Sequence, residues 1–514
     1  MQHSIRYTYT LFNFHMNILS HIWRRIIGSG KNNRGFGMVV VLFALLIVGW
    51  VIAEGSFKPF QILMLLIGFW FLLLVLIKPH VGVFATIVLI FIPLSIGNLF
   101  KIPGLQVTEV VIPLITIVYF LSKIIKRKPI FVFKRSVNPL LIPILLYFGV
   151  IFANYLRNPL PPSSILGIPQ EMGGLRRYYE FFLCFCAYFL FAGAVSTDTK
   201  IVRGIKELLW KISLILCLLG VVLIYSYPAQ NVLHSLHAQD IFSSRFFDTG
   251  GSELLETRYR TVSGASHIGT IGSMASVGLL LLFSGSKKVS SLSKWLLYGF
   301  LWCSLTLSGG RAGFVGTILA FCFWMVLQRK WKALPLLLVT GFIIYMSVFV
   351  YYDILPSQLQ RIFRIWGSLE QLEGGRGTVF PIFWNSFLEN PVFGVAMGSD
   401  NVQRAGLSHF ATMVLLFGGH GTYLSLLYTT GLLGFIPFLW IYLSGIKTSL
   451  CVFNRASNKI VKTLSFFCLL YLIYYLIPLG FGGFGADMPL FMVFGIISGV
   501  YIKFRKFQYF ELKK

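Results

Sequence analysis

Residues 421–444 have the sequence GTYLSLLYTTGLLGFIPFLWIYLS, a run of 24 residues without a charged side chain. A helix that crosses a bilayer needs about 20 mainly apolar residues, so this stretch predicts a transmembrane helix. The rest of the 514-residue chain is similar, because 56% of it is hydrophobic and only 12% is charged. A soluble domain carries about 25% charged residues. The composition therefore excludes a soluble globular enzyme and a disordered chain, and it predicts an integral membrane protein.

Apolar runs of this kind recur along the chain and predict an all-α, polytopic helical membrane protein with about 12–14 transmembrane helices. They centre on Gly37–Ala53, Phe60–Ile77, Val81–Gly97, Val107–Ser122, Asn138–Tyr155, Tyr179–Val195, Leu208–Ser226, His267–Ser284, Trp295–Ser308, Ala312–Leu327, Leu334–Tyr352, Gly421–Ser444, Thr463–Gly480 and Met488–Tyr501.

The net charge of +27 divides unevenly between alternate loops. One side, with both termini, holds 31 of the 44 Lys and Arg residues. Because cationic short loops stay in the cytoplasm, both termini are expected there. The charge is therefore an orientation signal, and nucleic acid is not an expected partner. The other 13 cations are eleven Arg and two Lys, and they accompany 14 of the 17 acids. Arginine suits bidentate phosphate or carboxylate binding.

The expected organisation follows from these runs and charges. It consists of a cytoplasmic N-terminal segment (1–36), transmembrane helices 1–11 (37–352), a large outer loop (353–420), transmembrane helices 12–14 (421–504) and a cytoplasmic tail (505–514).

Two outer loops are long, at 227–266 and 353–420, and loops of this length usually serve a function. The second loop contains two predicted amphipathic helices, Leu355–Leu372 and Arg376–Leu388, and Asn390-Pro391 ends the latter. Such a helix either lies on the membrane surface or forms a lid over a lipid-linked substrate.

Four outer motifs carry polar side chains at the ends of predicted spans. Arg311 lies in Ser308–Gly313, where flanking glycines permit close approach of a ligand. Arg258 and Arg260 precede a predicted helix start, whose dipole favours anions. The alternative for Arg311 is a side chain that reaches lipid headgroups. The alternative for Arg258 and Arg260 is that they balance the charges of Glu253 and Glu256.

The other two motifs belong to the large loop. His420 begins the last group of spans, where a histidine can act as a general base near neutral pH or be structural. Arg376 lies between Gly375 and Gly377, before the turn Pro391–Gly398. It is expected either to contact a ligand or to stand in the first turn of a surface helix.

Disulfide, metal and nucleotide chemistry have no support in the sequence. All seven Cys residues fall in predicted spans or a cytoplasmic loop, and no outer His, Asp and Glu set has ligand spacing. No phosphate-loop glycine motif occurs. No metal, cofactor or ATP is therefore expected.

In this order the motifs resemble the O-antigen ligase / O-antigen polymerase superfamily of bacterial envelope glycan assembly. The strongest match runs from His420 through Leu424 to Thr430-Gly431-Leu432-Leu433-Gly434, although Gly421 replaces the usual polar residue. Ser308–Gly313 matches with one glycine inserted before Arg311. The resemblance covers roughly Arg258–Phe435.

The resemblance implies a metal- and ATP-independent, inverting glycosyltransferase. It implies a glycan donor on undecaprenyl pyrophosphate and an acceptor hydroxyl on lipid A–core or on another glycan, at the periplasmic face of the inner membrane. His420 would be the general base and Arg311 a second catalytic residue, at the leaving pyrophosphate, and Arg260, Arg258 and Arg376 would bind the pyrophosphate. The alternatives are a repeat-unit polymerase of the same superfamily and, from another class, a lipid-linked glycan transporter.

Overall fold

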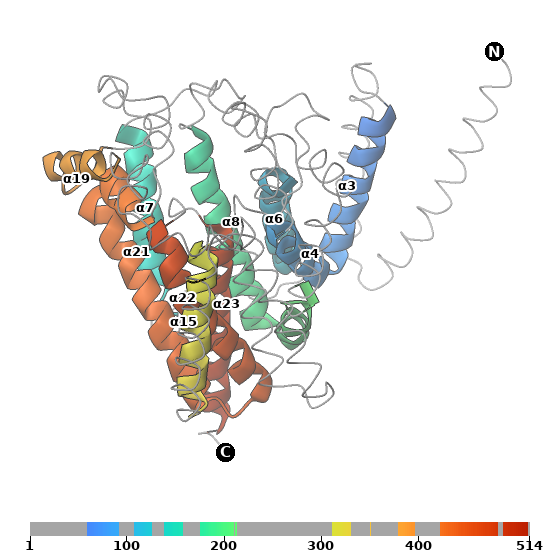
Figure 1. Ribbon diagram of the computed structural model, residues 1–514. Coiled ribbons are helices and arrows are strands. Elements are labelled where there is room, and N and C mark those ends of the chain that lie inside the picture. Colours follow the sequence, from blue (N-terminus) through green and yellow to red (C-terminus); the bar gives the residue numbers. More distant parts are fainter. Residues whose placement is uncertain are drawn as a thin grey trace, which may run out of the picture. The chain divides into compact units, whose positions relative to one another are not determined.

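The fold is described from a computed structural model, which places residues 59–91, 107–125, 138–157, 175–209, 211–212, 311–329, 350, 379–395, 422–481 and 487–511. Within these ranges the regular structure is helical and contains no strand, in agreement with the predicted all-α class. The helices are α3 (Pro59–Ile77), α4 (Pro79–Phe91), α6 (Val107–Ile125), α7 (Leu141–Arg157), α8 (Leu175–Thr197), α15 (Arg311–Leu327), α19 (Val379–Glu389), α21 (Thr422–Arg455), α22 (Lys459–Phe481) and α23 (Met488–Glu511) (Figure 1).

Nine of the predicted spans coincide with these helices, and five helices are long and apolar enough to cross a membrane. α21 and α23 continue beyond their predicted ends, to Arg455 and Glu511. The predicted spans 37–53, 267–284 and 295–308 lie outside the described residues, as do most of 208–226 and 334–352.

The chain forms two compact units, residues 1–82 with 117–130 and residues 83–116 with 131–514. In the first unit, α3 and the end of α6 are joined by a hydrogen bond from the Ser122 hydroxyl to the Leu76 carbonyl, at 2.9 Å. The second unit contains α7, α8, α15, α19, α21, α22 and α23, and the candidate site lies within it.

Glycines let α8 and α23 approach closely in the second unit. A Cβ atom at Gly495 would lie 2.5 Å from the Tyr188 carbonyl oxygen, and one at Gly499 would lie 2.5 Å from the Val195 Cβ. Small residues of this kind bring helix backbones together in membranes. Tyr188 also hydrogen-bonds the Ser498 hydroxyl at 3.0 Å, which satisfies both polar groups inside the unit.

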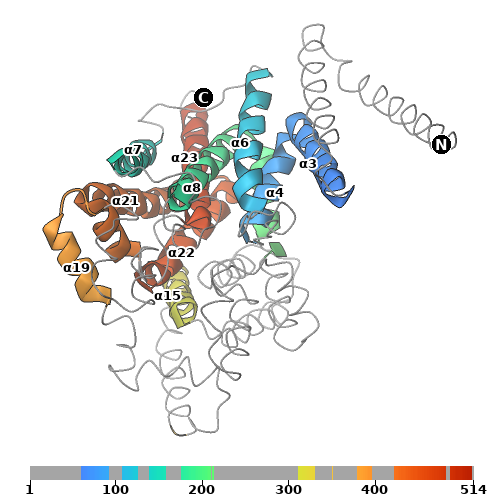
Figure 2. The same cartoon turned by 90° about the horizontal axis from the view of Figure 1, so that it is seen from above.

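An aromatic cluster joins four helices of this unit. The ring of Tyr147 on α7 lies 6.0 Å from Phe181 on α8, 5.7 Å from Phe438 on α21 and 5.9 Å from Phe491 on α23, measured between centroids. Tyr147, Phe181, Phe438 and Phe491 are all fully or almost fully buried. These ring contacts connect α7 to α8, α21 and α23, and Figure 2 shows the four helices from above.

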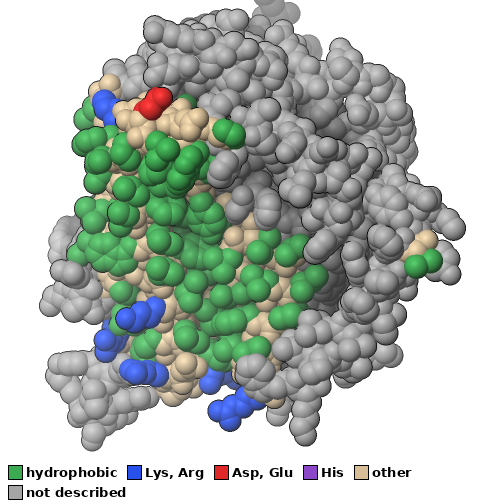
Figure 3. All heavy atoms as spheres, turned by 60° about the vertical axis from the view of Figure 1, so that its left-hand side comes forward, with side chains coloured by type: hydrophobic (Ala, Val, Ile, Leu, Met, Phe, Trp, Pro, Cys, Tyr) green, Lys and Arg blue, Asp and Glu red, His purple; other side chains and the backbone are tan. Residues whose placement is uncertain are grey.

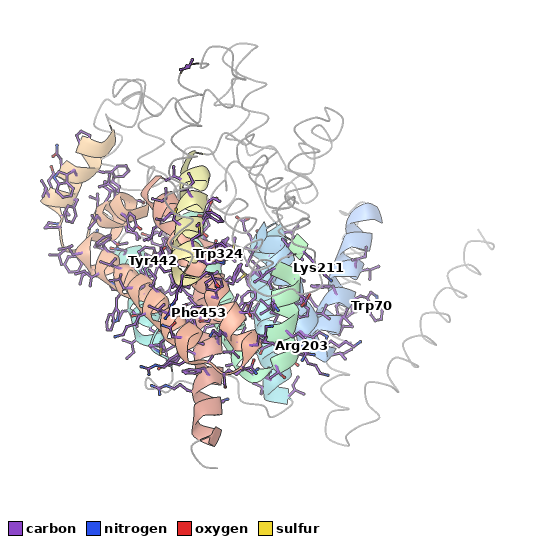
Figure 4. The ribbon with its side chains drawn as sticks, turned by 60° about the horizontal axis from the view of Figure 1, so that its bottom comes forward. Trp70, Arg203, Lys211, Trp324, Tyr442 and Phe453 are labelled. Carbon is purple, nitrogen blue, oxygen red and sulfur yellow. The ribbon has the colours of Figure 1, made fainter. Side chains whose placement is uncertain are left out.

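Lys and Arg gather at one end of the second unit, called here the cationic end. It is formed by the end of α21, the start of α22 and the end of α23, with Lys447, Arg455, Lys459, Lys462, Lys503, Arg505 and Lys506. Because Val195 of α8 meets Gly499 of α23, the helical segment after α8, with Arg203 and Lys211 (Figure 4), begins at the same end. These cations are among the 31 Lys and Arg residues that the sequence places on the side of the two termini.

Exposed apolar side chains cover the lateral surface between the two ends. Figure 3 shows a broad hydrophobic band with Lys and Arg along its lower edge. On α7 and α21 the band includes Phe152 at 61%, Leu156 at 62% and Ile436 at 56% exposure. A soluble monomer rarely exposes a contiguous apolar surface of this extent, so this is the surface expected of a multi-pass membrane protein.

α21 is broken at Gly431, whose φ is 60° and ψ −160°. The turn after α19 occupies the break, and we call Pro391–Val395 together with Tyr428–Leu433 the junction. Leu432 N donates to the Pro391 carbonyl at 2.9 Å, Leu433 N donates to the Val392 carbonyl at 3.1 Å, and Val395 N donates to the Tyr428 carbonyl at 2.8 Å. The turn therefore replaces helical bonds that the break removes, as an apolar environment requires.

Two glycines make the junction sterically possible. Gly394 has φ of 67°, and a Cβ atom there would lie 2.6 Å from Gly431 N. A Cβ atom at Gly431 would overlap the Val392 carbonyl. Both positions therefore combine a left-handed backbone with a contact that leaves no room for a side chain.

Alanine at either junction glycine is expected to destabilise the protein by about 2 kcal/mol or more, because backbone strain and overpacking each cost about 1–3 kcal/mol. The measurement is the thermal unfolding temperature of Gly394→Ala and Gly431→Ala in detergent. Gly149→Ala is the matched control, because a Cβ atom there meets nothing within 4 Å, and it is expected to be neutral or slightly stabilising. A wild-type unfolding temperature for Gly431→Ala would contradict the described junction.

Candidate functional site

Of the five residues that the sequence singles out, Arg311 is in a described helix. It is the first residue of α15, and its backbone but not its side chain is described. Arg258, Arg260, Arg376 and His420 lie outside the described residues. His420 precedes Thr422, the first residue of α21, by two positions. The structure therefore bears on the site through the helices that adjoin these residues.

The starts of α15 and α21 lie at the same end of the second unit, opposite the cationic end. Gly316, in the second turn of α15, meets Tyr474 in the last third of α22, where a Cβ atom would lie 2.8 Å from the Tyr474 carbonyl oxygen. Because α22 leaves the cationic end at Lys459, this contact brings the start of α15 to the other end. Both motifs were assigned to one side in the sequence analysis, and the helices that adjoin them agree.

α19 confirms the second predicted amphipathic helix over Val379–Glu389, and it ends before Asn390-Pro391 as expected. Phe383 and Phe387 are buried, and the Phe383 ring packs edge-on against Tyr428 of α21 with centroids 4.6 Å apart. α19 lies beside the first turns of α21 in both ribbon views (Figures 1 and 2). The packing explains why the turn after α19 reaches the break.

Exposed apolar side chains lie on α19 and in the turn that follows it. Trp384, Leu388, Val392 and Phe393 are 42–57% exposed and continue the apolar surface of α7 and α21. An exposed apolar face beside a membrane-facing surface is typical of a helix at the bilayer interface. This face is consistent with both interpretations of the helix, a surface helix and a lid over a lipid-linked substrate.

The last turn of α7 holds the junction in place. Arg157 donates a hydrogen bond from Nη2 to the Gly394 carbonyl at 2.6 Å, and its guanidinium lies 6.0 Å from the Phe393 ring centroid. Asn154 donates from Nδ2 to the Thr429 carbonyl at 3.5 Å. Arg157 is one of the eleven outer arginines in the charge count, and neither it nor Asn154 has a role predicted from the sequence. Their position in the last turn of a span, on the arginine-selected side, was the only signal.

Asp487 is a second feature without a predicted role. It precedes α23, where it accepts a hydrogen bond from the Leu490 backbone N–H at 3.1 Å and another from the Tyr475 hydroxyl of α22. Burial raises the pKa of its carboxyl from 3.8 to about 7, against a smaller lowering by the Leu490 N–H. An acid directly before Met488-Pro489 is a helix-start signal, and it could have indicated the cap.

The described residues contain neither a cluster of metal-ligating side chains nor a disulfide bond. No group of three or more His, Cys, Asp and Glu gathers there as a metal site. The described cysteines are free thiols, namely Cys184, Cys186, Cys322, Cys451 and Cys468.

Comparison with known protein families gives one match. Residues 296–439 match the family model described as O-Antigen ligase. The matched segment contains Arg311, Arg376, His420 and both sides of the junction, whereas Arg258 and Arg260 precede it. It supports the O-antigen ligase-like superfamily that the motifs indicate. No match was found among curated proteins.

Asp487→Asn is expected to change how stability depends on pH. Because the folded-state pKa is raised, the Asp487 contribution to stability is full below about pH 3.8 and is lost as the pH rises through about 7. The wild-type unfolding temperature should therefore fall more between pH 5 and pH 8 than that of Asp487→Asn, which does not titrate and keeps one acceptor oxygen for the Leu490 N–H. Parallel profiles for the two proteins would show that the carboxyl is not shielded from water.

Proposed function

We propose that this member of the O-antigen ligase-like superfamily transfers a glycan from undecaprenyl pyrophosphate to a sugar hydroxyl at the periplasmic face of the bacterial inner membrane. The observation that carries the proposal is the family match over residues 296–439, which contains Arg311, Arg376 and His420 in the order that the motifs require. The family match and the apolar helices support the more general description, a multi-pass membrane protein of polysaccharide assembly.

The proposed reaction is a single displacement. An acceptor hydroxyl oxygen attacks the anomeric carbon of the donor, the new glycosidic bond forms, and the bond to pyrophosphate breaks on the opposite face. His420 accepts the hydroxyl proton, and undecaprenyl pyrophosphate leaves with the bond electrons. Attack from the opposite face inverts the anomeric carbon. The cleaved glycosyl–pyrophosphate bond supplies the driving force, so the proposal includes neither ATP nor a metal.

In the proposal, the arginines stabilise the negative charge of the leaving group. Negative charge grows on the departing pyrophosphate, and cations placed there stabilise the transition state. Arg311 is favoured because it is the first residue of α15, where the helix dipole and free backbone N–H groups also attract anions. Arg260, Arg258 and Arg376 are proposed to assist in binding the donor.

Lipid substrates fit the surface of the second unit. The exposed apolar band on α7 and α21 continues onto α19, next to the start of α21. A polyprenyl chain in the bilayer would lie against such a surface while its pyrophosphate remained at the interface. This supports a lipid-linked donor and a lipid-linked acceptor, either lipid A–core or a second glycan.

A polymerase of the same superfamily is the alternative within the class. It would use the same donor, base and arginines, with a growing glycan as acceptor. Glycan length profiles separate the two activities, because loss of a polymerase leaves single repeats attached, whereas loss of a ligase leaves polymer unattached.

A transporter is the alternative from another class, and the junction argues against it. Broken helices of transporters turn their free backbone groups towards the substrate or ion. At the break of α21, the Leu432 and Leu433 N–H groups and the Tyr428 carbonyl pair with the turn Pro391–Val395. Those groups are therefore occupied by the chain itself.

His420→Ala and Arg311→Ala are expected to abolish or strongly reduce glycan display in cells that lack the native gene. Loss of a general base costs about 10²–10⁴ in rate, and loss of a transition-state cation costs about 10²–10³. The measurement is surface glycan on gels at matched protein level. Arg203→Ala removes an exposed arginine from the segment after α8 and should leave display unchanged. Normal display in both site variants would refute the assignment.

A further inference from the structure

The break removes two of the usual hydrogen bonds between the first segment of α21, Thr422–Thr430, and the rest of its helix. In an unbroken helix Leu432 N would donate to the Tyr428 carbonyl and Leu433 N to the Thr429 carbonyl. Both N–H groups instead donate to the turn after α19. Contacts from other parts of the chain therefore help to set the direction of this segment.

Two of these contacts come from one face of α7. Val395 N takes the place of Leu432 N at the Tyr428 carbonyl. The Thr429 carbonyl accepts instead from Asn154 Nδ2, at 3.5 Å, and Asn154 is 5% exposed. Arg157, three residues later and so on the same face, holds the Gly394 carbonyl at 2.6 Å. α7 thus binds one carbonyl on each side of the junction.

The Arg157 side chain also contacts the aromatic ring of Phe393. Its guanidinium lies 6.0 Å from the centroid of Phe393, within the range of a cation–π contact. A lysine could replace one hydrogen bond but not the planar contact, so the two residue types are not equivalent here. Both Asn154 and Arg157 precede the family-matched segment 296–439. The junction inside that segment is therefore held from outside it.

We infer that Arg157 and Asn154 are positioning residues for glycosyl transfer, which act by holding the first segment of α21, two residues after His420 in the chain. The inference rests on the proposed function, in which His420 is the general base. His420 lies two residues before α21, so a change in the direction of the first segment moves it. A misplacement of about 1 Å at a reacting group can cost about 10² in rate.

The test measures kcat and KM of purified full-length protein in detergent. The substrate is a lipid extract from cells that lack the native gene, containing their undecaprenyl-pyrophosphate-linked glycan and their acceptor. Arg157→Gln and Asn154→Leu are expected to lower kcat about 10–100-fold, with the KM for donor changed less than about twofold. Arg157→Lys and Asn154→Gln, which keep a donor, should retain more activity. Arg203→Gln is the control and should behave as the wild type.

Three results would overturn the inference. The first is a wild-type kcat for folded Arg157→Gln and Asn154→Leu. The second is a raised KM with unchanged kcat, which would make Arg157 a substrate-binding residue. The third is an equal loss in Arg203→Gln. If either of the first two variants does not fold, Arg157→Lys and Asn154→Gln decide by the same criteria. His420→Ala is run alongside, because its full activity would refute the proposed function, whereas its inactivity beside active Arg157 and Asn154 variants refutes only this inference.

Discussion

The backbone pairing between the turn Pro391–Val395 and the break in α21 is the interaction on which the second unit depends. A helix broken inside an apolar environment exposes N–H and carbonyl groups, each of which is costly without a partner. Here Leu432 N, Leu433 N and the Tyr428 carbonyl all pair with the turn. The pairing needs Gly394 and Gly431, and it places α19 against α21, where Phe383 meets Tyr428.

The two ends of the second unit differ in their residues. Lys and Arg gather where α21 and α23 finish, and this distribution is the usual signature of the cytoplasmic side. The other end combines the junction, Asp487 and the starts of α15 and α21. The proposed chemistry belongs to this second end, because Arg311 begins α15 and His420 lies two residues before α21. The sequence interpretation of the +27 net charge, as an orientation signal beside a small set of proposed functional arginines, is consistent with this distribution.

The sequence predicted the features that depend on local pattern. Apolar run length located nine described helices, and Asn390-Pro391 marked the end of α19. The break at Gly431 was not predicted, although the motif containing it was, because an isolated glycine in an apolar run does not reveal its φ angle. Arg157 and Asn154 were missed for a related reason. Their partners, Gly394 and Thr429, are more than 230 residues away, and the bonds are to backbone carbonyls that carry no side-chain signal.

The most direct measurement of the junction is photo-cross-linking from position 393. Phe393 is 57% exposed and its ring faces the Arg157 guanidinium, so a benzoylphenylalanine there should be tolerated and should lie within reach of α7. After irradiation in membranes, mass spectrometry of the digested protein maps the adducts. The account predicts adducts in the last turn of α7 and in the segment around the break in α21. Adducts confined to lipid, or to segments other than these two, would contradict it.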